Sequence, residues 1–385
     1  MNRSDFMERE LARLSREGLL RRLPALEDVD PPYIVLKGSG PVIDFCSNDY
    51  LGLSCRRELK EASCLAASRW GAGSRASRLL SGDHPLYQEL ERSVSRLKGT
   101  EACLVLGSGY LANTGIIPAV AAKGDLVLAD RQIHASLIDG IRLSGARLIR
   151  FPHNDLRRLE ELLEGAGGSR RVLVAVESLY SMDGDLCPLE DLLALKEKLP
   201  FILLVDEAHA VGLFGAQGEG LIPKELAPKV DLIIGTFGKA LGSYGAFCGC
   251  SGTMRQYLVN RCRTVIFSTA LPPGVLAASA RAVEMLSSLN EERTRVLEMS
   301  RDIARFIRDE LGISVPGQSQ IVSLIVGSSK KALELESFLL DRAMFARAIR
   351  PPTVAKGTER IRFSITAAHK PEHLEALKAA LREFF

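Results

Sequence analysis

The chain of 385 residues has no long apolar segment and no concentration of charge. No apolar run is long enough to span a bilayer, and the N-terminus lacks the apolar core of a secretory signal. The formal net charge of +3 is spread along the chain without a basic block, so neither nucleic acid nor an anionic membrane is indicated as a partner. We expect a cytoplasmic protein that has no membrane attachment.

Patterns of metal-binding or disulfide-forming residues are also lacking. The eight cysteines contain no CxxC pair and no regular spacing, and the six histidines contain no HExxH pair. Several cysteines lie among apolar residues, as in the segment 247–250. Buried, reduced thiols are therefore expected in place of a disulfide framework, and no metal site is predicted.

The sequence does contain a regular alternation of short apolar runs and helical stretches from about residue 54 to residue 330. Near-continuous apolar strands separated by helices are typical of an α/β protein with a mainly parallel sheet covered on both faces. The predicted strands are 103–106, 126–129, 147–151, 171–177, 201–206, 232–235 and 246–250. The predicted helices include 85–98, 111–122, 134–143, 155–164 and 188–198. From about Gly242 onward the strands follow too closely for a helical crossover, which predicts an antiparallel addition at one side of the sheet.

Three segments are predicted along the chain. Residues 1–53 contain an amphipathic helix over residues 4–22 and a short hairpin formed by residues 33–36 and 41–45. Residues 54–285 form a large ligand-binding domain, and residues 286–385 form a smaller α+β domain. The chain is long enough for such a division.

One glycine-rich string, Gly107-Ser-Gly-Tyr-Leu-Ala112, fits the dinucleotide-binding pattern. It follows a predicted strand and opens a helix, and Asp130 lies at about the distance expected for a ribose-binding acid. An NAD-binding oxidoreductase is therefore one interpretation. Glycine amides at a helix N-terminus bind any phosphate, however, so the string supports phosphate binding more strongly than it supports NAD.

A second string, Asp206-Glu-Ala-His209, is similar to a helicase motif. The chain has no GxxxxGK[ST] loop to hold a nucleotide, and Lys239 is followed by Ala240, which offers no hydroxyl group to Mg²⁺. A helicase is therefore rejected.

Lys239 lies in an unusual place, five residues after the apolar run 232–234 ends and among Thr236, Phe237, Gly238 and Gly242. Burying an ammonium group is costly unless its pKa falls or it is paired. A desolvated lysine can act as a nucleophile that forms a Schiff base. An exposed loop lysine is the alternative, and for this short stretch alone it is the commoner case.

Polar residues at neighbouring strand ends favour the functional interpretation of this lysine. Asp206 closes the apolar run 201–205, His209 follows three residues later, and His134 follows the strand at 126–129. An enzyme that uses pyridoxal phosphate (PLP) needs a lysine, an acid against the pyridine nitrogen, a phosphate seat and a group stacked on the ring. Ligands of parallel sheets bind at the carboxyl ends of the strands, where these residues are expected. The predicted phosphate seat consists of the Gly109 and Tyr110 amides and the Thr236 hydroxyl group.

Six longer strings identify the chain as a member of the α-oxoamine synthases, a family of PLP enzymes. They are Phe45–Leu53, Gly73–Gly82, Asp130–Leu137, Glu177–Asp185, Val205–His209 and Thr236–Lys239. The resemblance runs nearly end to end. It implies a fold-type I PLP-dependent transferase, with a large domain built on a mainly parallel mixed sheet and a smaller C-terminal α+β domain. It also implies a homodimer with a shared active site and pyridoxal 5'-phosphate as cofactor.

The segment Ile349–Arg362 resembles one branch of this family, although Ala355 stands where proline is expected. That branch condenses L-alanine with a pimeloyl thioester, pimeloyl-CoA or pimeloyl acyl carrier protein, in biotin synthesis. The products are 8-amino-7-oxononanoate, CO₂ and the free thiol carrier. A sister enzyme that uses glycine with acetyl-CoA or succinyl-CoA is the closer alternative, and the NAD-binding oxidoreductase is the more distant one.

The resemblance also assigns roles to single residues. Lys239 resembles the lysine that binds the cofactor and carries protons, Asp206 the partner of the ring nitrogen, and His134 the residue stacked on the ring. The remaining cofactor contacts that the resemblance implies are Gly109, Tyr110, Ser181, His209 and Thr236, with Ser268 and Thr269 supplied across the dimer interface. The implied substrate contacts are Asn48 and Arg362 for the amino acid carboxylate, His134, and Arg21, Arg350 and Thr353 for the acyl substrate. Arg22 is adjacent to Arg21, and a shift of one residue would exchange the two.

Overall fold

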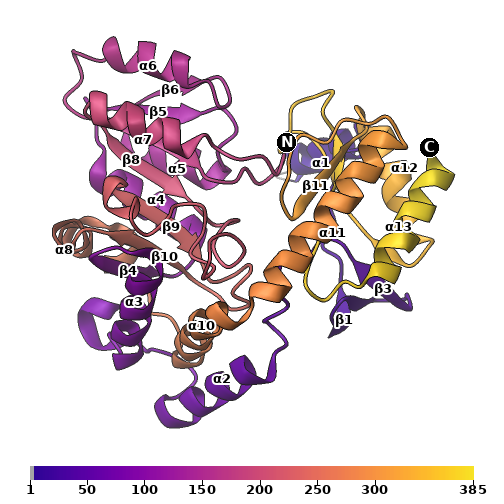
Figure 1. The fold of residues 1–385 in the computed structure, drawn as a ribbon, viewed down its shortest axis with the longest axis horizontal. Helices are drawn as coiled ribbons and strands as arrows, with labels where there is room; N and C mark the ends of the chain where they lie inside the picture. The colour runs from indigo at the N-terminus through magenta and orange to yellow at the C-terminus, as the bar shows by residue number, and fades with distance from the viewer. Residues whose placement is uncertain (1–3) are drawn as a thin grey trace. The chain divides into compact units, whose positions relative to one another are not determined.

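The computed structural model describes residues 4–385, which divide into two compact units (Figure 1). Unit 2 contains Asp49–Ser181 and Leu186–Arg293. Unit 1 contains Met182–Asp185, Thr294–Phe385 and the N-terminal residues up to Asn48. The N-terminal segment thus shares a unit with the C-terminal part of the chain, whereas the sequence predicted it as a segment of its own.

A seven-stranded sheet organises unit 2. Its order is β4-β10-β9-β8-β7-β5-β6. The strands are β4 (Ala102–Leu106), β5 (Leu126–Asp130), β6 (Arg147–Phe151), β7 (Val172–Glu177), β8 (Ile202–Asp206), β9 (Leu232–Thr236) and β10 (Ala246–Cys250). Strands β5 to β9 pair in parallel, and β10 is antiparallel to both of its neighbours. The predicted, mainly parallel sheet is confirmed. The antiparallel strand is β10, and it lies between β9 and β4 because it pairs with β9 on one side and with β4 on the other.

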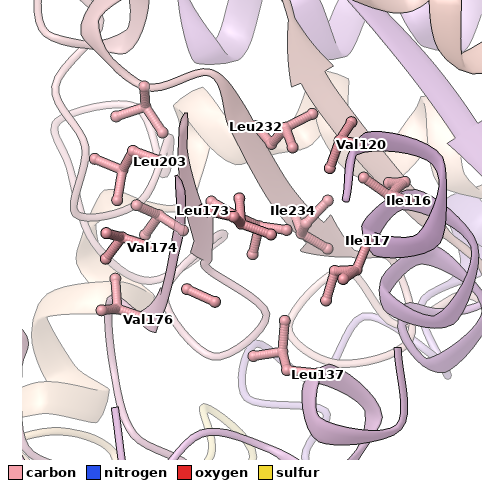
Figure 2. Packing of buried hydrophobic residues seen from close by; sticks show 14 of the residues in the cluster. Ile116, Ile117, Val120, Leu137, Leu173, Val174, Val176, Leu203, Leu232 and Ile234 are labelled. Carbon is pink, nitrogen blue, oxygen red and sulfur yellow. The ribbon is translucent and has the colours of Figure 1, made fainter. Parts of the chain in front are cut away.

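The helices that follow strands β4, β5, β6 and β7 bury apolar side chains in the core of this sheet. The helices of unit 2 are α2 (Arg57–Trp70), α3 (Pro85–Lys98), α4 (Gly109–Val120), α5 (Ala135–Ser144), α6 (Leu156–Glu164), α7 (Leu189–Lys198), α8 (Gly252–Arg261), α9 (Arg263–Ile266) and α10 (Pro273–Met285). In contrast, α2 packs against α10. Figure 2 shows Ile116, Ile117 and Val120 of α4 directed toward side chains of the central strands, such as Leu173 and Ile234. Each fully buried aliphatic side chain of this kind contributes about 1.5–3 kcal/mol to folding.

Unit 1 contains two small sheets, of order β1-β2-β3-β12 and β11-β14-β13. The strands are β1 (Leu26–Asp30), β2 (Tyr33–Leu36), β3 (Pro41–Asp44), β11 (Ile321–Ile325), β12 (Met344–Phe345), β13 (Ala348–Ile349) and β14 (Arg360–Ser364). The helices are α1 (Asp5–Arg16), α12 (Ser329–Leu340), α13 (Pro371–Phe384) and most of α11 (Asn290–Asp309). The predicted hairpin is confirmed as β2 and β3, which pair antiparallel.

The first helix is shorter than the sequence predicted. It ends at Arg16 and not near residue 22, because Gly18 has a φ of 65° and turns the chain out of the helix. Strand β1 was not predicted at all, because its five residues are exposed and include three acids.

Two expectations about the whole chain concern cysteines and membrane spans. The structure places five of the eight cysteines in buried positions, and all eight are free thiols. Among residues 4–385, no helix combines the length and the apolar composition needed to cross a membrane.

Candidate active site

A cavity of about 190 Å³ lies in unit 2, where strands β7, β8 and β9 end. Seven of the residues predicted from the sequence line it: Gly109, Tyr110, His134, Asp206, His209, Thr236 and Lys239. The parallel register explains why they meet. Glu177 of β7 pairs with Asp206 of β8, and Asp206 pairs with Ile234 of β9, so the ends of these strands lie at one edge of the sheet.

Lys239 is half-buried and contacts a histidine. Its Nζ lies 2.7 Å from Nε2 of His209, and Nδ1 of the same ring lies 2.7 Å from the hydroxyl group of the buried Tyr50. The turn after the lysine requires glycine, because a Cβ at Gly242 would lie 2.3 Å from the backbone nitrogen of Ser54. The structure therefore places Lys239 in a series of polar contacts, with His209 and Tyr50, that the sequence did not reveal.

Asp206 is buried, with 5% of its surface exposed, and both of its carboxylate oxygens accept hydrogen bonds. Oδ1 accepts the backbone N–H of Ala208 at 2.9 Å, and Oδ2 accepts the side-chain amide of Asn113 at 2.8 Å. The same amide nitrogen donates to the hydroxyl oxygen of Ser136 at 3.0 Å. Asn113 was not predicted from the sequence as a site residue. A single asparagine on the buried face of an apolar helix is nevertheless unusual, and it indicates a specific hydrogen-bond partner.

His134 caps the N-terminus of α5. Its side chain accepts the backbone N–H of Ser136 at 3.2 Å, and its Nδ1 lies 2.8 Å from the hydroxyl oxygen of the same serine. Partial removal of water lowers the pKa of His134, as does the positive charge of Lys239, while Asp206 acts in the opposite direction. A neutral imidazole is therefore favoured at the cavity wall.

Glu177 closes β7 in the same way that Asp206 closes β8, and it was not predicted. Its Oε1 accepts the backbone N–H of His134 at 2.5 Å. Burial raises the pKa of Glu177 to about 8, and the negative charge of Asp206 adds to this rise. The cavity thus contains two buried carboxyl groups on adjacent strands.

The start of α4 provides donors on another side of the cavity. Ser108 caps this helix by accepting the backbone N–H of Leu111 at 3.2 Å, which leaves the amides of Gly109 and Tyr110 in the first turn. An added Cβ at Gly109 would meet no atom within 4 Å, so there is open space beside this helix end. The Thr236 hydroxyl group donates to the carbonyl oxygen of Gly245 at 2.8 Å and accepts the Gly238 N–H at 3.1 Å. Helix N-termini with free amides bind phosphate groups.

Three predicted cofactor residues do not line the cavity of their own chain. Ser181 is buried four residues after Glu177. Ser268 and Thr269 follow α9 in half-buried and exposed positions, next to the exposed Phe267.

Of the predicted substrate residues, His134 lines the cavity in unit 2, and the others belong to unit 1 and form two groups. Arg362 donates a hydrogen bond to the side-chain oxygen of Asn48 at 3.2 Å. In the second group, Arg21 donates to the carbonyl oxygen of Pro351 at 3.3 Å, and the buried Arg350 donates to the carbonyl oxygen of Gly18. Thr353 is exposed on the same loop, and Arg22 is exposed beside Arg21.

Asp130, the ribose-binding acid of the NAD interpretation, is fully buried, and its carboxylate contacts other residues of the chain. Its carboxylate accepts the backbone N–H groups of Gln132 at 2.7 Å and Asn154 at 2.8 Å, and it lies 2.9 Å from Nδ1 of His153. A ribose hydroxyl group has no access to this carboxylate, so the geometry argues against the NAD interpretation.

Comparison with known proteins agrees with this geometry. The family described as class I and II aminotransferases matches residues 40–381. The 8-amino-7-oxononanoate synthase of Trichlorobacter lovleyi is 43% identical over 379 residues, which cover 98% of this chain and 96% of the relative. The enzyme of the same name from Geobacter sulfurreducens is 43% identical over 375 residues, which cover 97% and 96%.

Solved structures show the same relationship. A serine palmitoyltransferase from S. paucimobilis with bound PLP–myriocin aldimine has a TM-score of 0.92 at 30% identity, covering 99% of this chain and 98% of that chain. The 8-amino-7-oxononanoate synthase of Francisella tularensis has a TM-score of 0.77 at 27% identity, covering 89% and 96%.

The chain therefore belongs to the class I and II aminotransferase family, and it is a fold-type I PLP-dependent transferase. Within this class it is similar to the 8-amino-7-oxononanoate synthases, which are α-oxoamine synthases, as the sequence motifs implied. The chain is an enzyme, and PLP is its cofactor.

The residues of the cavity suit PLP. A lysine amine, a buried carboxylate, two imidazoles and an open helix N-terminus face the same space, which matches the aldehyde, pyridine and phosphate groups of the cofactor.

Proposed function

We propose that this chain condenses L-alanine with a pimeloyl thioester, carried on coenzyme A or on acyl carrier protein. The products are 8-amino-7-oxononanoate, CO₂ and the free thiol carrier, as in biotin synthesis. The proposal is supported by full-length relatives of that name and by the motifs at 349–362. The observation that carries it is the presence of Lys239, His209 and Asp206 around one cavity.

Bound PLP supplies an electron-accepting ring that stabilises negative charge at the amino acid Cα. The buried Asp206 carboxylate holds a proton on the ring nitrogen, and Asn113 fixes the direction of this carboxylate. Because Asp206 is buried, water screens its charge less than it would at the surface.

Lys239 binds the cofactor and then carries the proton of the substrate Cα. An amine is a suitable base there because its proton transfer is reversible, and the product needs a proton returned at the same carbon. The His209 ring contacts the Lys239 amine and is itself held by Tyr50, so the amine has a defined position before substrate enters.

The phosphate group is held by the first-turn amides of α4 and by Thr236. The Thr236 hydroxyl group donates to Gly245 in the structure, so this role requires its hydrogen to turn toward a phosphate oxygen. His134 covers the cofactor ring and Ser181 lies near the ring oxygen.

Substrate binding is assigned to His134 of unit 2 and to residues of unit 1. Arg362, which is hydrogen-bonded to Asn48, binds the amino acid carboxylate, so that this group is held in position for loss of CO₂. Arg21, Arg350 and Thr353 bind the acyl substrate or its carrier. Two neighbouring guanidinium groups suit either a carboxylate or a phosphate.

We also propose that the active enzyme is a homodimer in which Ser268 and Thr269 bind the phosphate group in the partner's site. Support comes from their position outside the cavity of their own chain and from the exposed Phe267 beside them, with 68% of its surface accessible. Sedimentation should give a dimer. A monomer that binds PLP and turns over normally would exclude the shared site.

Two experiments test the proposed function. Borohydride reduction of the PLP-loaded protein, followed by peptide mass mapping, should yield pyridoxyl-lysine at Lys239, and labelling of another lysine would exclude the mechanism. Product analysis should then pair L-alanine, glycine or serine with pimeloyl, acetyl, succinyl and palmitoyl thioesters. Preference for L-alanine with the pimeloyl thioester is expected. Preference for glycine with a short acyl group would establish the sister activity.

A further inference from the structure

Glu177 is a buried carboxyl group in the cavity that the chemistry described above does not use. It occupies the last position of β7, and its register partner on β8 is Asp206. Side chains at paired positions of parallel strands point to the same face, and both carboxyl groups line the cavity. Only 3% of Glu177 is exposed.

The contacts of Glu177 connect two other residues of the site. Its Oε1 accepts the backbone N–H of His134, at the start of α5, at 2.5 Å. The backbone N–H of Ser181, in the loop that follows β7, also donates to this carboxyl group. His134 is the residue assigned to the face of the cofactor ring, and Ser181 is the one assigned to the ring oxygen. The Glu177 side chain thus contacts the backbones of both.

We propose that Glu177 is a positioning residue of the cofactor site: its buried carboxyl group fixes the backbones of His134 and Ser181 and thereby sets the orientation in which the PLP ring is held. The inference rests on the PLP-dependent function proposed above and extends it to a residue that the sequence did not single out.

The charges around Glu177 support this role. Asp206 faces it from β8, Lys239 from the segment after β9, and His134 from the start of α5. His209 lines the same cavity. Burial and the charge of Asp206 raise the pKa of Glu177 to about 8, whereas Lys239 and the two backbone N–H groups lower it. At neutral pH the glutamate is therefore mostly a neutral acid. Such a group still accepts the His134 N–H, and it leaves Asp206 as the carboxylate that faces the ring nitrogen.

Three variants of the PLP-loaded protein separate positioning from a general structural effect. Glu177→Gln keeps an oxygen that accepts the His134 N–H but cannot ionise. Glu177→Ala removes the contact. Ser178→Ala is the matched control, because Ser178 is the next residue, is fully buried, does not line the cavity, and its hydroxyl oxygen has no hydrogen-bond partner in the part of the chain that the structure describes.

The measurements are PLP affinity by absorbance titration, circular dichroism of the visible cofactor band, its dependence on pH, and thermal unfolding. Glu177→Ala should weaken PLP binding by about tenfold, the effect of one lost hydrogen bond to the site, and should alter the sign or intensity of the dichroic band. Glu177→Gln should restore both to within about threefold of the wild type and should change the pH dependence of the band near pH 8. Ser178→Ala should match the wild type in every measurement.

The inference is overturned if Glu177→Ala binds PLP with wild-type affinity and dichroism. It is overturned equally if the glutamine variant fails as badly as the alanine variant, or if its cofactor band titrates as in the wild type. Should the alanine variant not fold, the glutamine variant alone decides through its dichroism and pH dependence. Failure of the proposed function is distinguishable, because it would appear in the wild-type protein as no borohydride adduct on Lys239.

Discussion

The buried pair of Lys98 and Glu207 allows a quantitative test of how the active-site loop is held. Lys98 is the last residue of α3, and Glu207 directly follows Asp206. Both side chains are fully buried, and the lysine donates to the glutamate and to the carbonyl oxygen of Glu219. The other carboxylate oxygen accepts the backbone N–H groups of Leu221 and Ile222, at 2.7 and 3.1 Å. One ion pair thus fixes the loop that carries His209.

Lys98→Met keeps most of the side-chain volume but removes the cation, so the Glu207 carboxylate stays buried without its partner. Breaking a buried pair from one side costs about 3–5 kcal/mol, whereas replacing both partners often costs little. The double variant Lys98→Met with Glu207→Gln should therefore be more stable than the single variant, because the glutamine oxygen still accepts the Leu221 and Ile222 amides.

Urea unfolding of the PLP-loaded proteins, followed by far-ultraviolet circular dichroism, measures these differences in the free energy of unfolding. A loss below about 1 kcal/mol in the single variant would show that the carboxylate is compensated by other groups. A double variant no more stable than the single one would refute the reasoning, since the unpaired charge would then not be the cause.

Three further predictions concern the cavity. Asp206→Asn should still bind PLP, but kcat for L-alanine should fall by about 10²–10³-fold because the charge that faces the ring is lost; a kcat within threefold of the wild type would exclude this role. Tyr50→Phe removes the 2.7 Å contact with His209 and should lower the free energy of unfolding by about 0.5–1.5 kcal/mol in urea titrations, with no change expected if the phenol hydroxyl does not hold the imidazole. Because the pKa of Glu177 is raised from its ordinary 4.5 to about 8, the PLP-free folded chain holds a proton between these values that the unfolded chain has lost. Its stability should therefore fall as pH rises through that window, by at most about 1.4 kcal/mol per pH unit, and Glu177→Gln should flatten this slope in urea titrations at pH 5.5 and 7.5.

The sheet and seven of the eleven residues that line the cavity could be predicted because their signals are local. A strand buried on both faces reads as an apolar run. Asp206 stands out because it directly follows such a run, and Lys239 stands out because it is a charged residue in the glycine-rich turn after the next one. Glu177 ends β7 in the same manner, so the same rule would have found it had it been applied to every strand.

Other features depend on contacts that no local pattern contains. Asn113 lies in an apolar helix, and its importance comes from the Asp206 carboxylate on a distant strand. Tyr50 contacts His209 across a separation of 159 residues in the chain. Strand β1 is charged and exposed, and it exists because β2 offers it a partner edge. Tertiary pairing decides all three cases.

The place of β10 between β4 and β9 has a consequence for how the chain is made. Strand β4 is almost entirely buried in the finished protein, yet within residues 4–385 its only neighbour in the sheet is β10. Strands β5 to β9 can pair with one another as they leave the ribosome. Strand β4 is synthesised first among the seven strands, but it can pair only after β10, which is synthesised last. During that interval its apolar edge is open to wrong partners. The start of α4 directly follows β4, so the phosphate seat takes its final place in the sheet only when β10 has been synthesised.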